Sequence, residues 1–262
     1  MADYVVTGAA SGMGAATAAR LCSDGHRVIG IDRRDADVAA DLGTVAGRRD
    51  AIAAVHALTE SLAGIALFAG LGGATGRPAH DLVSVNYFGS IDVLVGLRPL
   101  LAAAAESYAL LISSNSTTCQ PGWDPALVEA CLDGDEARAC EIADQRDSVM
   151  AYPATKTAVA HWARRHAPTD EWIGAGIRLN ALAPGLVETP LAAAQRDDPV
   201  LGPFVRDFPV PVGRGATAAE LAEVAVFLLE PTARFFCGSV VCCDGGTEAL
   251  LRPDDWPARW QL

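Results

Sequence analysis

The feature that most constrains the fold is a glycine-rich turn near the N-terminus. Asp3–Thr7 has the apolar character of a strand, and an alanine-rich stretch with helical character ends at about Ser23. Glycines between a strand and a helix allow a tight turn and let the backbone approach a pyrophosphate at the helix N-terminus. Their spacing here is G-x-x-x-G-x-G. This unit predicts a dinucleotide-binding fold whose phosphate contacts are Gly8, Ser11, Gly12, Met13 and Gly14.

A second expected strand, Arg27–Asp32, ends in an acid about 20 residues after the glycines. A carboxylate at this place accepts hydrogen bonds from both hydroxyls of an adenine ribose. Arg33 follows directly and could instead hold a 2′-phosphate. Because the acid would repel that phosphate, the sequence predicts NAD rather than NADP. We expect Asp41 and Leu42 to contact the same cofactor.

Strand-like and helix-like segments alternate along the remaining chain. The expected strands are 64–70, 108–114, 176–185 and 237–243, and the expected helices are 44–62, 82–104, 151–165 and 217–230. Such alternation predicts an α/β domain, 1–262, with one doubly wound (Rossmann), mostly parallel sheet and helices on both faces. An acidic segment, about 117–149, has helical spacing over 126–144. A proline-punctuated apolar segment, about 187–212, has the composition of a loop that covers a substrate.

Tyr152 and Lys156 stand four residues apart in the expected helix 151–165, so they project from one face about a turn apart. Pro153 lacks an N–H and is easiest to place in a first helical turn, near the positive end of the helix dipole. A nearby ammonium favours phenolate, and a tyrosine whose pKa fell from about 10 towards 7–8 could exchange a proton with a ketone or alcohol. An interfacial tyrosine beside a solvated lysine would leave the same short pattern.

Two further polar side chains fall at informative places. Ser114 ends the expected strand 108–114, where open parallel sheets bind their ligands. Asn86 is an amide in the otherwise apolar expected helix 82–104. Its amide could have a structural role, as a hydrogen-bond donor to a neighbouring carbonyl, or a functional role, holding a water molecule beside Lys156.

Composition excludes several classes of partner. The formal net charge of -12 disfavours nucleic acid, whose phosphates require clustered Lys and Arg. No apolar run is long enough to span a membrane, and no secretory signal is visible, so we expect no membrane partner. Seven cysteines without a C-x-x-C pair argue against a disulfide framework or a metal site. We therefore expect a cytoplasmic protein that binds no metal.

The order of these pieces resembles that of the short-chain dehydrogenase/reductase family over nearly the whole chain. The resemblance is carried by Thr7-Gly8-x3-Gly12-x-Gly14, Asp32, Ala69-Gly70, Asn86, Ser114, Tyr152-x3-Lys156 and Pro184-Gly185 with Thr189. Within the family the chain looks most like the bacterial 3α-hydroxysteroid dehydrogenase/carbonyl reductase type. That likeness includes Ser84-Val-Asn-Tyr-Phe-Gly, Arg178-Leu-Asn-x-x-Ala-Pro-Gly and Glu188-Thr-Pro-Leu.

The resemblance implies an enzyme that interconverts a secondary alcohol and a ketone with NAD. Tyr152 would be the acid/base, Ser114 would polarise the carbonyl, and Lys156 would bind the nicotinamide ribose and lower the tyrosine pKa. Asn86 would complete a water site for proton relay. Further cofactor contacts are expected at Ala69, Gly70, Leu71, Pro184, Gly185, Val187 and Thr189.

The implied substrate is an apolar, ring-containing carbonyl compound such as a 3-oxo- or 3-hydroxysteroid. Two alternatives stay open: the same chemistry on a small polar acyl or sugar substrate, and a non-catalytic dinucleotide-binding regulator. The chain also departs from the family pattern. The usual Asn-Asn-Ala-Gly reads Phe68-Ala-Gly-Leu, and residues 117–149 form an insertion between Ser114 and Tyr152.

This acidic insertion bears on assembly. Folded against the helices that most members use in a four-helix interface, it would cover them, and two facing copies would repel. We therefore expect a homodimer through strand 237–243 and helix 217–230, near a Trp-containing tail. The alternative is that the insertion folds outward as a flap over the active-site mouth.

Overall fold

The structure, a computed structural model, describes residues 1–120 and 122–255. Its centre is a seven-stranded sheet with strand order β3-β2-β1-β4-β5-β6-β9, in which each neighbouring pair is parallel. The strands are β1 (Asp3–Thr7), β2 (Arg27–Asp32), β3 (Val38–Ala39), β4 (Gly64–Leu67), β5 (Ser107–Ile112), β6 (Ile177–Pro184) and β9 (Val240–Cys243). The doubly wound parallel sheet is confirmed, although the short β3 was not predicted.

Strand β1 sets the position of the functional edge. It pairs with β2 on one side and with β4 on the other, so Val5 lies opposite both Ile29 and Ile65. All three side chains are buried, as expected for strands covered on both faces. The strand order reverses at β1, and open sheets of this kind bind ligands at the carboxyl ends of the strands beside such a reversal.

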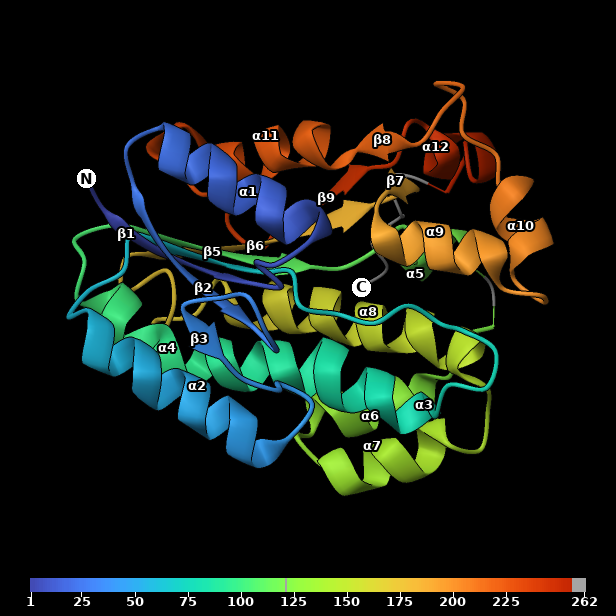
Figure 1. Cartoon of the computed structure of the whole chain (residues 1–262), viewed down its shortest axis with the longest axis horizontal. Coiled ribbons are helices and arrows are strands. Elements are labelled where there is room, and N and C mark those ends of the chain that lie inside the picture. Colours follow the sequence, from blue (N-terminus) through green and yellow to red (C-terminus); the bar gives the residue numbers. More distant parts are fainter. Residues whose placement is uncertain (121, 256–262) are drawn as a thin grey trace, which may run out of the picture.

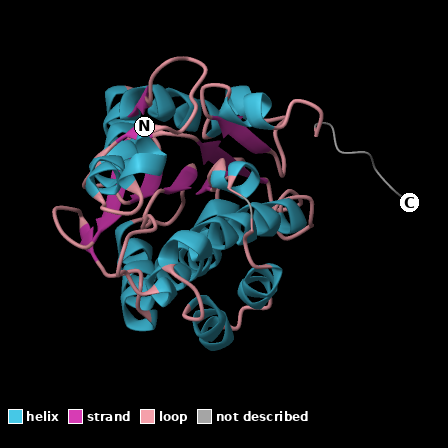
Figure 2. Cartoon of the chain, turned by 90° about the vertical axis from the view of Figure 1, so that its right-hand side faces the viewer, coloured by secondary structure: helices cyan, strands magenta, loops and turns pink. Residues whose placement is uncertain are grey.

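Helices cover both faces of the sheet (Figures 1 and 2). Helices α1 (Gly12–Ser23) and α11 (Ala218–Leu228) pack together on one face. Helices α2 (Val45–Leu58), α4 (Gly89–Ala102) and α8 (Ser148–His166) lie on the other. The start of α11 follows from its sequence, because the Thr217 hydroxyl and the Glu220 carboxylate cap each other's backbone N–H groups.

The single helix expected over 82–104 is interrupted. It consists of α3 (Ala79–Leu82), a π-helical turn η1 (Val83–Phe88) and α4. Asn86 lies in the π-helical turn and is fully buried. Turns of this kind are often found at functional sites, and their backbone register leaves no periodic trace in a sequence.

The acidic segment 117–149 folds into short helices rather than one. They are α5 (Ser116–Cys119), α6 (Pro125–Leu132) and α7 (Glu136–Ala143). The stretch 126–144, expected to be helical, is interrupted at Gly134, whose φ is +75°. Asp135 then caps α7. Helix α6 packs against α8, and α7 packs against α3 and η1 (Figure 1). Arg48, itself buried, binds Glu136 at 2.5 Å and Asp92 at 2.8 Å.

The segment expected as a loop over 187–212 is more ordered than its proline content suggested. It holds β7 (Val187–Glu188), α9 (Pro190–Asp197) and α10 (Gly202–Arg206), and β7 pairs with β8 (Ala216–Thr217). Thr189 caps α9 through Ala192, and Pro190 occupies its first turn. The chain continues through η2 (Pro231–Ala233) and α12 (Thr247–Leu251). The Trp-containing tail lies outside the described residues.

Over residues 1–120 and 122–255, no helix combines the length and the apolar character needed to cross a membrane.

Candidate active site

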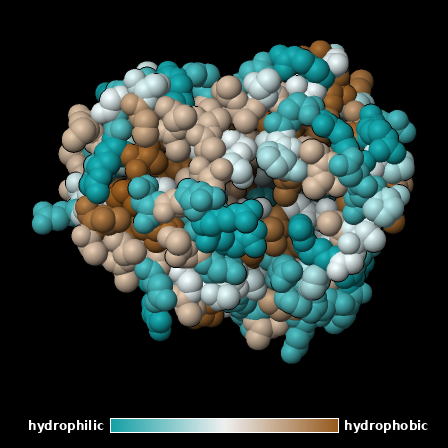
Figure 3. Space-filling view, in the orientation of Figure 1, coloured by the Kyte–Doolittle hydropathy of each residue, from teal (hydrophilic) through white to brown (hydrophobic). Residues whose placement is uncertain are grey.

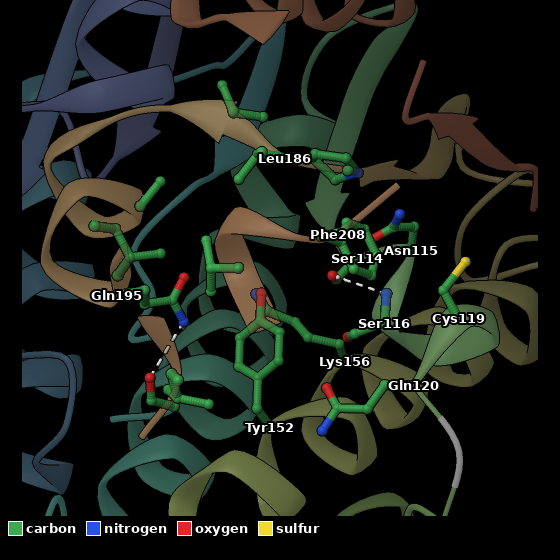
Figure 4. Close-up of a pocket in the computed structure, with 18 of the residues that line it drawn as sticks. Ser114, Asn115, Ser116, Cys119, Gln120, Tyr152, Lys156, Leu186, Gln195 and Phe208 are labelled. Carbon is green, nitrogen blue, oxygen red and sulfur yellow. Dashed lines mark hydrogen bonds between the residues drawn. The ribbon is translucent and has the colours of Figure 1, made fainter. Parts of the chain in front are cut away.

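Three expected catalytic side chains line one cavity of about 780 Å³ at the carboxyl ends of the strands (Figure 4). Tyr152 and Lys156 come from α8, and Ser114 follows β5. The structure therefore brings together residues that lie 38 positions apart in the sequence. Side chains from the 187–212 segment form another wall, including Leu191, Leu201, Phe204 and Phe208.

The hydrogen bonds around Ser114 orient its hydroxyl. Its Oγ accepts the backbone N–H of Ser116 at 3.1 Å, which leaves the hydroxyl proton for another acceptor. Ser114 and Tyr152 line the same cavity. The neighbouring Ser113 donates to the carbonyl of Lys156 at 2.9 Å and so fixes α8 against β5.

Burial controls the ionisation of the other two groups. The pKa of Lys156 falls to about 8 because the ammonium is desolvated. Desolvation also raises the pKa of Tyr152, and the nearby Ser114 hydroxyl opposes this rise. The expectation that a nearby ammonium lowers the pKa of the tyrosine is wrong for this structure, because burial raises that pKa. Lys156 Nζ lies 5.9 Å from the Tyr152 ring centroid and donates instead to the carbonyl of Ile112 at 2.9 Å.

Pro153 also lies elsewhere than expected. Helix α8 begins at Ser148 and is capped by Asp147, whose carboxylate accepts the N–H of Met150 at 2.9 Å. Pro153 is consequently in the helix interior, and Tyr152 lies beyond the first turn, where the helix dipole has little effect. The aspartate cap, not the proline, marks the start of the helix.

Asn86 takes the structural role that the sequence had left open. Its Oδ1 accepts the N–H of Leu71 at 2.7 Å, and its Nδ2 donates to the Leu71 carbonyl at 2.9 Å. It lines neither of the two cavities described here. The amide thus holds the segment after β4 in place, next to Lys156.

A second cavity adjoins the first on the side of the glycine-rich turn. It is lined by thirteen of the expected cofactor contacts: Gly8, Ser11, Gly12, Met13, Gly14, Asp32, Arg33, Asp41, Leu42, Ala69, Gly70, Leu71 and Thr189. Pro184, Gly185 and Val187 line the first cavity. Six residues line both cavities, which therefore form one continuous site: Met13, Phe68, Gly70, Leu71, Thr189 and Leu191. Figure 3 shows a recess near the centre of this side of the molecule.

The glycines of the turn are required by close backbone packing. A Cβ on Gly8 would lie 2.9 Å from the backbone nitrogen of Ala69, and one on Gly14 would lie 2.2 Å from the Gly8 carbonyl oxygen. Gly12 has a φ of +55°, which favours glycine. The turn thus leaves an open cradle of backbone at the N-terminus of α1, which fits a dinucleotide pyrophosphate.

Two backbone N–H groups fix the carboxylate of Asp32 at the end of β2. Its Oδ2 accepts the backbone N–H of Ala10 at 3.1 Å, and its Oδ1 accepts that of Arg33 at 2.7 Å. These bonds fix the carboxylate at the rim of the second cavity, where an adenine ribose of a dinucleotide would lie. Within the described residues, no group of three or more His, Cys, Asp or Glu side chains could hold a metal ion.

Several lining residues were not predicted. Asn115, Cys119, Gln120, Asp147 and Gln195 all face the first cavity. Most of them lie in or beside segments whose folding the sequence did not indicate. Of these residues, only Asn115 could have been predicted to line the site, because it directly follows Ser114 at the end of an expected strand.

Comparisons with known proteins place the chain among oxidoreductases. Residues 4–188 match the NAD dependent epimerase/dehydratase family, and residues 140–248 match the family described as Enoyl-(Acyl carrier protein) reductase. The chain is 39% identical to 3-alpha-hydroxysteroid dehydrogenase/carbonyl reductase of Comamonas testosteroni, covering 97% of this chain and 99% of that protein. It is 33% identical to cis-4-hydroxycyclohexanecarboxylate dehydrogenase of Sinomonas cyclohexanicum, over 94% and 96% of the two chains.

A solved structure is similar over the same length. The 3-alpha-hydroxysteroid dehydrogenase of Pseudomonas sp. B-0831, in complex with NADH, superposes with a TM-score of 0.93 at 44% identity, covering 97% of this chain and 100% of that one. Fold, site and relatives define an oxidoreductase built on a doubly wound dinucleotide-binding sheet. The chain belongs to the short-chain dehydrogenase/reductase family.

Proposed function

We propose that this protein is an NAD-dependent enzyme that interconverts a secondary alcohol and a ketone, with a hydroxysteroid or a similarly apolar cyclic compound as substrate. The observation that carries the proposal is the continuity of the two cavities. One is lined by Ser114, Tyr152 and Lys156, and the other by the glycine-rich turn and Asp32.

The residues present divide the chemistry between them. Bound NAD(H) would supply or accept the hydride. Tyr152 donates a proton to the carbonyl oxygen in reduction and removes the hydroxyl proton in oxidation. Ser114 donates a hydrogen bond to the same oxygen and stabilises the charge that develops on it. Lys156, Thr189 and the backbone at Val187 would hold the nicotinamide half of the cofactor.

Asp32 supports NAD over NADP. A carboxylate at this position repels a 2′-phosphate, and Arg33 would have to overcome that repulsion. The similar structure from Pseudomonas sp. B-0831 was solved with NADH, which agrees with this preference.

The substrate assignment rests on the shape and lining of the first cavity. Its volume is in the range that accommodates rigid multi-ring molecules, and its outer wall carries Leu201, Phe204 and Phe208. Both curated relatives described above have cyclic alcohols in their names. A small polar acyl or sugar substrate would leave this apolar surface unfilled, and a non-catalytic regulator would not need Ser114, Tyr152 and Lys156 together.

A cofactor-and-substrate screen tests the proposal. Purified protein is mixed with NADH or NADPH and with polycyclic ketones, short polar ketones and keto sugars, and turnover is followed at the nicotinamide absorbance. Oxidation of NADH with a polycyclic ketone is expected. Turnover confined to sugars would overturn the substrate class, and no turnover with any pair would favour the regulator.

The proposal extends to the cell compartment and to Asn86. All seven cysteines are free, which supports a reducing, cytoplasmic location. The relay role of Asn86 is supported only by its position next to Lys156, because Leu71 engages its amide.

For assembly, we propose a homodimer through β9 and α11. Helices α6 and α7 cover α8 and α3, which supports a different contact face. Helix α11 exposes Phe227, and Phe235, in the segment that leads to the edge strand β9, is fully exposed. The size in solution should be that of a dimer, and Phe235→Asp or Val240→Asp should yield monomers. A tetramer insensitive to both changes would contradict this arrangement.

A further inference from the structure

One carbonyl of α8 cannot receive its regular helical hydrogen bond. Pro153 lies in the interior of the helix and has no N–H, so the carbonyl four residues earlier, that of Val149, loses its donor. Tyr152 lies between these two residues. The missing bond therefore falls in the turn that carries the catalytic phenol, where loose geometry would be most harmful.

Another side chain supplies the missing donor. Gln120 Nε2 donates to the Val149 carbonyl at 2.9 Å. Gln120 directly follows α5, and its own backbone N–H donates to the carbonyl of Ser116 at 3.1 Å. The N–H of Ser116 in turn donates to Ser114 Oγ. Gln120 thus joins the turn that presents Ser114 to the turn that presents Tyr152 (Figure 4).

We propose that Gln120 is a positioning residue for Tyr152. By satisfying the Val149 carbonyl that Pro153 leaves without a donor, it fixes the first turns of α8 and hence the phenol relative to Ser114. This inference rests on the proposed function, in which Tyr152 transfers the proton. It needs no contact between Gln120 and the reacting atoms.

The competing role for Gln120 is a direct contact with substrate, because its side chain also lines the first cavity. The two roles predict different dependences on residue 153. A substrate contact would appear mainly in KM and would persist whatever residue 153 is. A positioning role would appear in kcat and would vanish once the helix regained its own donor, as in Pro153→Ala.

The experiment is a double-mutant cycle on the full chain with NADH and a ketone substrate. Gln120→Met keeps the length of the side chain and removes the donor, and Pro153→Ala restores the backbone N–H. In the wild-type background, Gln120→Met should lower kcat about tenfold, because the partly buried Val149 carbonyl loses its donor and the turn that carries Tyr152 loosens. NADH affinity should stay within about twofold. In the Pro153→Ala background, the same substitution should change kcat less than about twofold.

Urea unfolding of the same four proteins measures the contribution of the Gln120–Val149 hydrogen bond to stability, and it needs no substrate. Gln120→Met should lower the urea midpoint in the wild-type background and leave it nearly unchanged beside Pro153→Ala. If Gln120→Met alone does not fold, Pro153→Ala can still be compared with the double variant. The proposal requires these two proteins to have the same kcat, and a lower kcat in the double variant would contradict it.

Three results would overturn the proposal: equal losses in both backgrounds, an effect confined to KM, or coupling in stability without coupling in kcat. Absence of turnover in the wild type would instead be a failure of the proposed function, and the urea midpoints would still report on the hydrogen bond.

Discussion

The ammonium nitrogen of Lys156 donates to the carbonyl of Ile112 at 2.9 Å while lying 5.9 Å from the centroid of the Tyr152 ring. The lysine is thus anchored to the end of β5 rather than to the phenol. Because both groups are buried, each is driven towards its neutral form: the lysine pKa falls and the tyrosine pKa rises. In the free protein, Tyr152 is therefore a phenol suited to protonating a ketone.

The ionisation of Tyr152 in the free protein follows from this arrangement. We expect its phenol to ionise only above the ordinary range of tyrosine, since burial raises its pKa. The phenolate absorbance of the wild type during a pH titration, minus that of Tyr152→Phe, isolates this one group. Ionisation between pH 7 and 8 would mean that Lys156 controls the phenol after all.

Lys156 is the only lysine in the sequence, which makes its pKa directly measurable. Protein labelled with isotopic lysine should give a single side-chain NMR signal that titrates at about pH 8. A titration near pH 10.5, the ordinary value for lysine, would show that the ammonium is solvated and would contradict its buried position.

The same burial carries a stability cost. The unfolded lysine keeps its proton up to about pH 10.5, whereas the folded one loses it near pH 8, so stability from this group rises with pH between those values. Lys156→Met should therefore raise the free energy of unfolding at pH 7 by up to roughly 3 kcal/mol while abolishing turnover. Urea unfolding should show no such gain above pH 10.5, and destabilisation of equal size at both pH values would refute this account.

Cofactor choice should depend on Asp32. Asp32→Ala is expected to shift the ratio of kcat/KM for NADPH over NADH upwards by about tenfold or more, because it removes a repelling carboxylate and leaves Arg33 to bind the phosphate. Asp50→Ala, an exposed change on α2, is the matched control and should leave the ratio unchanged. A wild type that already uses NADPH as well as NADH would contradict the role given to Asp32.

The wall formed by α9, α10 and the segment after them should select for apolar area. Leu201→Ala and Phe208→Ala are each expected to lower kcat/KM for a rigid polycyclic ketone by about tenfold or more, since a buried large side chain contributes about 1.5–3 kcal/mol. A short polar ketone should be affected less. Leu58→Ala, at the end of α2 and away from the cavity, controls for general destabilisation. Equal losses for both ketones would contradict the selection.

Sequence reasoning was most successful where the local chemistry is decisive. The glycine turn, Asp32, Ser114 and Tyr152 are each a residue type that one structural context requires, and in the structure they line the two adjoining cavities. The alternation of apolar strands and helices sufficed to predict the doubly wound parallel sheet. Outcomes that depend on tertiary contacts were missed: the π-helical turn around Asn86, the helices within 187–212, and the bond from Gln120 to Val149.

The pKa of Tyr152 was missed for a related reason. A pair four residues apart on a helix fixes which face the two side chains share, but it does not fix the carbonyl that the lysine reaches. Desolvation is a property of the whole packed site, and in this site it outweighs the charge of one neighbour. The predicted position of Pro153 in the first turn of the helix was wrong, because that prediction relied on the high frequency of proline in first helical turns.

The most direct test of the central claim is the turnover of Tyr152→Phe. This change keeps the ring and removes the proton, so kcat should fall by about 10²–10⁴-fold while NADH affinity is nearly kept. Tyr87→Phe is the matched control, a buried tyrosine that lines neither cavity. A Tyr152→Phe enzyme with kcat close to that of the wild type would contradict the assignment of Tyr152 as the acid and base of this site.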